Sequence, residues 1–379
     1  MSARTSSGPG ILTRVFGSQW FVSVLAVLIA FVIGAVLIAL SGASVVDAYY
    51  AMFRGSIIDP NAATFVRQIK PLTDSLFYSI PLIISGLGLA LGFRAGLFNI
   101  GGKGQIIVGA LAAVWVGFAV NLPPVLHTLV ALLVAIVAGG LYAGIAGVLK
   151  AKTGANEVIV TIMLNSIATL GLGYVLAQKA WQVPGSNQPV TPKVADSAAL
   201  TRLLPAPFKL HVGFIVALVA LAFFWWLIER STLGFQIRAV GANAAAARTA
   251  GISVERITAI TMVLSGAFLG LAGANEALGT IGYVSRDVAG SIGFDAITVA
   301  LLGRNKTWGT FGAGLLFGAF KAGGYTMQAK GVPIDMILIL QSVIVLLIAA
   351  PALVRWLFRL PDVRALAART RKGNADEHK

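Results

Sequence analysis

The stretch Phe93-Arg94-Ala95-Gly96-Leu97-Phe98-Asn99-Ile100-Gly101-Gly102-Lys103-Gly104-Gln105 decides the fold, because it is a polar, glycine-rich break between two apolar runs, residues 79–92 and 106–120. Each run is short for a membrane-spanning helix, which needs about 20 apolar residues. Polar side chains in this break would be costly against lipid. Two interpretations stay open: a tight cytoplasmic loop between two ordinary helices, or a break at membrane depth that lines a pathway for solute. Interrupted hydrophobic segments are typical of such pathways, which favours the second.

The composition is that of a membrane protein. Of the 379 residues, 57 % are hydrophobic and 11 % are charged, whereas a soluble domain carries about 25 % charged residues. We therefore predict an all-α, polytopic integral membrane protein. The chain has no cysteine, which excludes disulfides, thiolate metal sites and a cysteine nucleophile. Its three histidines, His127, His211 and His378, lack a metal-ligand spacing. We expect no catalytic residue, no metal site and no enzyme activity.

The basic residues give the chain a net charge of +15. They lie at the ends of apolar runs and in the C-terminal tail, which argues against binding of nucleic acid and indicates contact with membrane lipid. When Lys and Arg residues are counted in the loops on each side of the membrane, the side with more of them also holds both termini. That side is the cytoplasm by the positive-inside rule.

The apolar runs predict about ten transmembrane helices in a domain over residues 19–354. A cytoplasmic segment, residues 1–18, precedes this domain, and a basic cytoplasmic tail, residues 355–379, follows it. A mixed segment, residues 41–74, follows the first helix and contains a short surface helix around residues 45–53. The predicted transmembrane helices cover residues 19–40, 76–92, 105–120, 125–149, 156–178, 211–228, 257–278, 294–302, 311–327 and 335–350.

The Gly101-Gly102-Lys103 sequence does not form a phosphate-binding loop. In the pattern G-x-x-x-x-G-K-[ST], the first glycine position is Leu97 and the Ser/Thr position is Gly104. We therefore expect no cofactor in this chain, and any use of ATP must come from a partner.

A polar stripe is predicted on the helix that starts at Asn156. Glu157, Thr161, Asn165 and Thr169 are four residues apart, which places them on one face of a helix. Facing the interior of a bundle, this stripe either holds helices together or lines a path for solute, and the sequence leaves both open. The predicted pathway residues are Asn99, Lys103, Gln105, Glu157, Thr161 and Asn165.

The cytoplasmic loop over residues 231–256 contains a second candidate site. Asn243 is a good N-cap, the four alanines after it favour a helix, and Gly251 is a good C-cap. The pattern predicts a helix of about two turns. Its smooth alanine face suits insertion into the groove of a partner, although a plain connecting helix would have the same sequence.

At these three stretches the sequence resembles the permease subunits of bacterial ABC importers of the nucleoside and simple-sugar (ribose-type) class. The resemblance spans about residues 71–351. The residues of the first two stretches resemble those of the nucleoside permeases within this class. The segments that carry it are Ala95–Gln105, Asn156–Ile159 with Met163–Asn165, and Gly241–Asn243 with Ala246–Arg248 and Ala250–Ile252.

The resemblance implies a multi-pass protein of the bacterial inner membrane that imports nucleosides by alternating access. Its implied partners are ABC ATP-binding subunits that hold ATP and Mg, a second permease subunit, expected to be a different chain, and an extracytoplasmic substrate-binding lipoprotein. One departure is Lys103, where the family commonly has Glu. The implied coupling residues, which would meet the ATPase, are Gly241, Asn243, Ala247, Arg248, Gly251 and Ile252.

Two alternative functions remain at this stage. The first is an ABC permease for a simple sugar such as ribose. The second is an ion-coupled secondary transporter that needs no ATPase and uses paired carboxylates within its spans. Only Glu157, Glu276 and Asp295 are available for such a pair, which weakens the second alternative.

Overall fold

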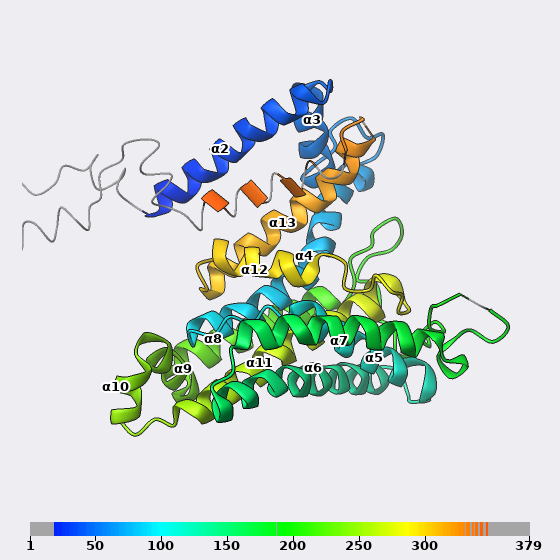
Figure 1. Ribbon diagram of the computed structural model, residues 1–379. Helices are drawn as coiled ribbons and strands as arrows, with labels where there is room; N and C mark the ends of the chain where they lie inside the picture. The colour runs from blue at the N-terminus through cyan, green and yellow to red at the C-terminus, as the bar shows by residue number, and fades with distance from the viewer. Residues whose placement is uncertain are drawn as a thin grey trace, which may run out of the picture. The chain divides into compact units, whose positions relative to one another are not determined.

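The computed structural model describes residues 19–329 except residue 187, and a few positions between 331 and 347. The predicted segment 1–18, the basic tail 355–379 and most of the last predicted helix, residues 335–350, lie outside the described residues. In the described part the regular elements are helices, with one isolated β-bridge between Arg202 and His211. This confirms the all-α prediction for that part of the chain (Figure 1).

The chain divides into two compact units. The first comprises residues 1–50 and 327–379, and contains α2 (Gln19–Leu40) and the start of α3 (Val45–Ser56). In this unit the Tyr49 hydroxyl donates a hydrogen bond to the carbonyl oxygen of Phe31, and their rings meet edge to face at 5.5 Å. Both helices agree with the prediction. The second unit, residues 51–326, holds the remaining elements and the candidate sites.

The long helix α4 (Phe65–Arg94) begins earlier than predicted. The prediction started at residue 76 because Lys70-Pro71 and Asp74 suggested a polar loop, and it was wrong there. Thr64 caps the helix by accepting a hydrogen bond from the Arg67 amide, and Lys70 pairs with Asp74 one turn along. The polar residues therefore form the first turns of the helix.

The other predicted helices of the second unit are present, with ends shifted by a few residues. A 3-10 turn (Lys179–Trp181) follows α7, and a π-helical segment (Glu276–Ile281) continues α11. The remaining elements are α5 (Gly102–Ala119), α6 (Leu126–Thr153), α7 (Glu157–Ala177), α8 (Gly213–Arg230), α9 (Thr232–Ala242), α10 (Ala244–Thr249), α11 (Val254–Asn275), α12 (Ile292–Leu302) and α13 (Thr307–Gln328).

Six of the described helices are long and apolar enough to cross a membrane: α4, α5, α6, α7, α8, and α11 with its π-helical continuation. Two shorter apolar segments, Val27–Leu40 and Ile292–Leu302, accompany them. The chain is thus a polytopic helical membrane protein.

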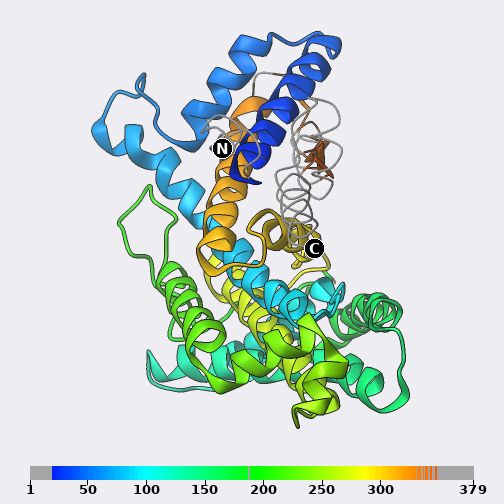
Figure 2. The ribbon, with the colours of Figure 1, turned by 90° about the vertical axis from the view of Figure 1, so that its left-hand side faces the viewer.

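The core of the second unit forms where α11 packs along α6 and against α5 and α4 (Figures 1 and 2). Glycines permit this close approach. A Cβ atom on Gly109 of α5 would lie 2.4 Å from the Cα of Gly270 of α11, and one on Gly139 of α6 would lie 2.5 Å from the Gly266 carbonyl oxygen. Small residues allow helix backbones to touch in a membrane, where apolar burial alone does not drive association.

Candidate functional site

The break between α4 and α5 is a capped helix end followed by irregular backbone. Gly96 has φ = +73°, a left-handed conformation that glycine adopts without strain. The Leu97 amide donates to the Gly92 carbonyl oxygen at 2.9 Å, and the Gly96 amide donates to that of Phe93 at 3.1 Å. These two bonds are the Schellman pattern of a helix C-terminus. Helix α5 resumes at Gly102, so the break predicted from the sequence is present.

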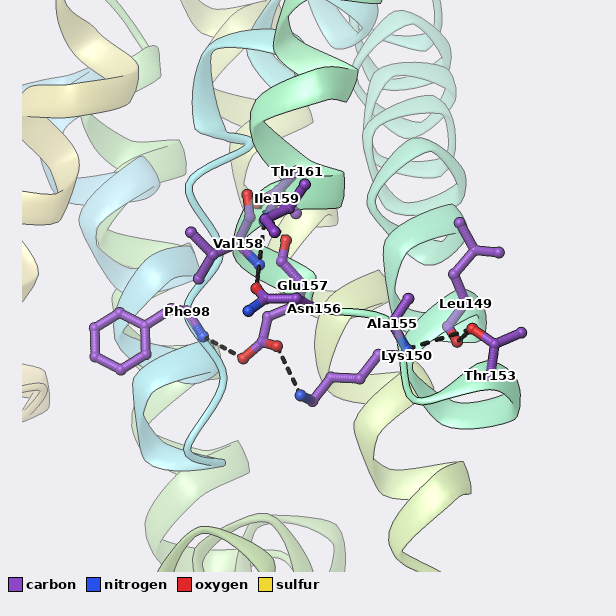
Figure 3. A network of polar contacts seen from close by, with 10 residues as sticks. All are labelled: Phe98, Leu149, Lys150, Thr153, Ala155, Asn156, Glu157, Val158, Ile159 and Thr161. Atoms are coloured by element: carbon purple, nitrogen blue, oxygen red, sulfur yellow. Dashed lines mark hydrogen bonds and ion pairs between the residues drawn. The ribbon is translucent and has the colours of Figure 1, made fainter.

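Glu157 of α7 contacts this break directly. Its Oε1 accepts a hydrogen bond from the Phe98 amide at 3.4 Å, and its Oε2 lies 2.6 Å from the Lys150 ammonium at the end of α6 (Figure 3). Asn156 caps α7 by accepting a hydrogen bond from the Val158 amide at 2.9 Å (Figure 3). The carboxylate therefore connects three segments: the break, α6 and α7.

The next two residues of the polar stripe pair with the same irregular backbone. Thr161 Oγ1 accepts from the Ile100 amide at 3.3 Å. Asn165 accepts from the Gly104 amide through Oδ1 and donates to the Ile100 carbonyl oxygen through Nδ2, both at 2.8 Å. Non-helical backbone inside a membrane needs such partners, because lipid offers none. The stripe supplies them.

Asn99 and Gln105 bind each other across the break. Asn99 Nδ2 donates to Gln105 Oε1 at 3.0 Å, and Gln105 Nε2 donates to Asn99 Oδ1 at 2.9 Å. Asn99 also donates to the Ser265 hydroxyl of α11 at 2.9 Å. Both amide side chains are 1 % exposed. This pair fixes the break against the core helix.

Lys103 differs from the other predicted pathway residues. It lies in the first turn of α5, is half-buried, and forms no ion pair with the described residues. A Cβ atom on Gly293 of α12 would lie 2.4 Å from the Lys103 amide nitrogen, so α12 contacts the backbone there. The structure thus joins five of the six predicted residues in one network around the break and leaves the Lys103 side chain outside it.

The short helix predicted after Asn243 is present as α10. Asn243 Oδ1 accepts from the Ala246 amide at 3.0 Å, and Gly251 has φ = +82°. The Ile252 amide donates to the Ala247 carbonyl oxygen at 3.0 Å, which closes a second Schellman motif. Local caps therefore define this short helix at both ends.

The cytoplasmic loop that contains α9 and α10 meets the end of α4. A Cβ atom on Gly241 would lie 2.0 Å from the Arg94 carbonyl oxygen. The Arg94 guanidinium donates to the Asn305 carbonyl oxygen at 2.7 Å, between α12 and α13. Arg248 on α10 is exposed and pairs with Glu255 at 2.9 Å. The last turn of α9, which leads into α10, therefore lies directly against the end of α4.

A second polar cluster, which the predicted pathway residues do not include, lies between α12, α13 and the π-helical segment. Lys321 Nζ lies 3.7 Å from Asp295 Oδ2, and the Ser291 hydroxyl donates to the same oxygen at 2.6 Å. Lys321 also interacts electrostatically with Glu276, which is hydrogen-bonded to Thr280. Ionisable residues in membrane helices mark functional sites. The sequence signal was a lysine inside an apolar run.

His211 precedes α8 and is buried, with 1 % of its surface exposed. Its Nδ1 accepts a hydrogen bond from the Gly213 amide at 3.0 Å, and Phe77 lies edge to face at 5.5 Å. Burial lowers the pKa of His211 to about 4. The imidazole is therefore neutral near pH 7.

Comparison with known proteins identifies the family. The family model "Branched-chain amino acid transport system / permease component" matches residues 72–349. The guanosine ABC transporter permease protein NupP of Bacillus subtilis (strain 168) is 39 % identical over 89 % of this chain and 95 % of its own. The nucleoside ABC transporter permease protein NupB of Lactococcus lactis subsp. cremoris is 30 % identical over 92 % and 94 %.

The glucose ABC transporter permease protein TsgB13 of Haloferax volcanii is 36 % identical over 85 % of both chains. No solved structure matches. The chain belongs to the branched-chain amino acid transport system / permease component family, and it is a multi-pass inner-membrane permease of an ABC transporter, in which a separate subunit hydrolyses ATP.

Proposed function

We propose that this chain is the permease subunit of an ATP-driven importer of nucleosides. We infer nucleosides as the substrate because the chain is similar, over about nine tenths of its length, to permeases named for guanosine and for nucleosides. A simple sugar is the second candidate, because a permease named for glucose is 36 % identical. Membership of an ABC permease family sets the ion-coupled alternative aside.

Three kinds of partner complete the importer: ABC ATP-binding subunits, a second permease subunit that is a different chain, and an extracytoplasmic substrate-binding lipoprotein. The permease itself has ten spans with both termini in the cytoplasm. The excess of Lys and Arg on the side of the coupling loop supports this orientation. The coupling residues of α10 and its flanks contact the ATP-binding subunit.

ATP binding by the partners drives alternating access through α10. Support for this step comes from the close contact of Gly241 with Arg94, because it transmits a displacement of the coupling loop to the end of α4. Ligands shift conformations only through differential affinity. ATP and the loaded binding protein must therefore favour different states of the permease.

The break and the stripe on α7 form one wall of the pathway. Asn99, Gln105, Thr161 and Asn165 hold its backbone in shape, as their mutual hydrogen bonds support. Lys103, which stands outside this network, supplies the charge that the solute or a partner meets.

Reconstitution of the complete transporter in vesicles tests the proposed function. With the binding lipoprotein outside and ATP inside, we expect uptake of radiolabelled guanosine that unlabelled uridine competes for and that ribose and glucose do not affect. Vesicles without ATP, or with an ion gradient only, should show no accumulation. Uptake of glucose or ribose in place of guanosine would support the sugar permease instead, and accumulation without ATP would overturn the ABC mechanism.

A further inference from the structure

A cavity of about 600 Å³ lies between the first turns of α4, the last turns of α13 and the end of α3. All the residues that line it belong to the second unit. Glycines bring the elements together: a Cβ atom on Gly55 would lie 1.9 Å from Thr326 Oγ1, and one on Gly318 would lie 2.5 Å from the Ser75 carbonyl oxygen. The cavity lining includes none of the residues that the sequence predicts for the pathway or for coupling.

The cavity lies on the opposite side of the bundle from the coupling helix. Asp74 lines it, while Arg94, at the other end of the same helix, contacts the coupling loop. Twenty residues of α-helix span about 30 Å, which is the thickness of the hydrocarbon core of a bilayer. Since α10 faces the cytoplasm, the cavity opens toward the side from which an importer receives its solute.

Two tyrosines give the cavity an aromatic face. The rings of Tyr78 on α4 and Tyr325 on α13 lie 5.5 Å apart with an angle of 34° between their planes. Tyr325 is 49 % exposed although its helix packs against α4. An exposed aromatic ring beside a second ring offers a planar ligand a surface to stack on, and every nucleobase has such a face.

Hydrogen-bonding groups surround these rings. Asp59 pairs with Arg54 at 2.6 Å, and Lys70 pairs with Asp74. Asp74 Oδ1 has no hydrogen-bond partner among the described residues. A buried acceptor without a donor is costly, so a ligand hydroxyl or amino group that reached this oxygen would be held favourably while Oδ2 keeps its pair with Lys70. Ribose hydroxyls and base amino groups are donors of this kind.

A row of polar side chains continues from the aromatic pair into the bundle. Lys321 pairs with Asp295 at 3.7 Å, and Glu276 of the π-helical segment lies close enough to Lys321 and to Tyr78 for their charges to affect one another. These residues come from α4, the π-helical segment, α13 and α12. The row therefore extends from the cavity toward α12, whose Gly293 contacts the backbone of the central break.

We infer that this cavity is the solute entrance of the permease, where a nucleoside base stacks on Tyr325 and Tyr78 before it passes along the row of charged side chains. The inference rests on the proposed function and adds the site at which the solute is recognised. A planar base that carries a ribose with hydroxyl donors matches both the aromatic face and the carboxylate acceptors of the cavity.

The test uses the complete transporter in vesicles and three variants. Tyr325→Ala should raise the KM for guanosine about tenfold, the loss that one base–aromatic stack produces, while the ATPase rate stays within twofold of the wild type. Tyr325→Phe, which keeps the ring, should retain the wild-type KM. Tyr174→Ala removes a tyrosine that is 69 % exposed on α7 and does not line the cavity, so it should leave the KM and the ATPase rate unchanged.

A photoreactive nucleoside gives a second readout. We expect 8-azidoguanosine to label the peptide that contains Tyr325 in the wild type, with competition by guanosine, and to lose this label in Tyr325→Ala. An unchanged KM together with absence of the label would overturn the inference while guanosine uptake by the wild type leaves the proposed function intact. Wild-type vesicles that import no nucleoside would overturn both. If Tyr325→Ala changed only the affinity of the permease for the binding lipoprotein, the cavity would be a docking site for that protein, and the inference would be overturned.

Discussion

Gly241 lies directly against the Arg94 carbonyl oxygen, with room for a hydrogen atom but not for a methyl group, because a Cβ atom there would approach to 2.0 Å. One residue belongs to the last turn of α9 and the other ends α4. The loop that is proposed to meet the ATPase and the helix that leads to the central break thus share one contact.

Gly241→Ala is expected to separate these two segments. The added methyl group must displace the end of α4 or α9, so we expect uptake to fall at least tenfold while ATP hydrolysis by the partner continues without stimulation by solute. Gly171→Ala on α7 is the control, because a Cβ atom there meets no atom within 4 Å. Parallel measurement of uptake and ATPase rate checks both. Normal coupling in Gly241→Ala would show that this contact transmits nothing.

Arg248 on α10 tests the contact with the partner. Both side chains of its pair with Glu255 are exposed, and solvent screens such surface pairs so that they contribute little to stability. Arg248→Glu should therefore leave the protein folded in the membrane and abolish uptake. The double variant Arg248→Glu with Glu255→Arg restores an ion pair within the chain, and we expect it to stay inactive. Recovery of uptake in the double variant would assign Arg248 a role in the shape of the loop alone.

Asn165 tests the role of the polar stripe. Replacement by Leu leaves the buried Gly104 amide and the part-buried Ile100 carbonyl oxygen unpaired, and a buried group left without a partner costs about 1–3 kcal/mol. We expect a clear fall in the melting temperature of the detergent-solubilised protein, together with reduced uptake. Thr169→Val is the matched control, because among the described residues the Thr169 hydroxyl bonds only to the Asn165 carbonyl oxygen of its own helix. If Asn165→Leu melts like the wild type, the stripe does not hold the break.

His211 predicts a dependence of stability on pH. Since burial lowers its pKa from 6.5 to about 4, the unfolded chain binds the proton more readily than the folded protein does. The contribution that the neutral His211 makes to the free energy of unfolding is therefore fully present above pH 6.5. It is lost as the pH drops toward 4, by about 3 kcal/mol in total. Asn at this position can still accept from the Gly213 amide and does not titrate.

Melting curves in detergent between pH 7.5 and 4 should show a steeper loss in the wild type than in His211→Asn. Parallel curves for the two proteins would contradict the assignment of the titration to this buried imidazole.

Features that local sequence specifies were predictable. The ends of the central break and of α10 depend on Gly96, Asn243 and Gly251, whose cap preferences act within a few residues. The start of α4 was missed because Pro71 and its charged neighbours suggested a loop, whereas Thr64 caps a helix that includes them.

Contacts between distant segments were not predictable in the same way. Tyr78 and Tyr325 are almost 250 residues apart in the chain, and Asp295 meets Lys321 across two helices. Helical periodicity predicts on which face of its own helix a residue lies, but it does not predict which other helix packs against that face. The stripe on α7 was visible for this reason, while its partners in the break became clear only from the fold.

The glycine contacts between α5, α6 and α11 bring the helix backbones together with no side chains between them, so these helices cannot easily slide past one another. Close-packed interiors switch between discrete arrangements and do not deform continuously. We therefore expect the three helices to turn as a rigid body during the transport cycle, with the bending confined to seams such as Glu276–Ile281, where the helical hydrogen-bond register widens.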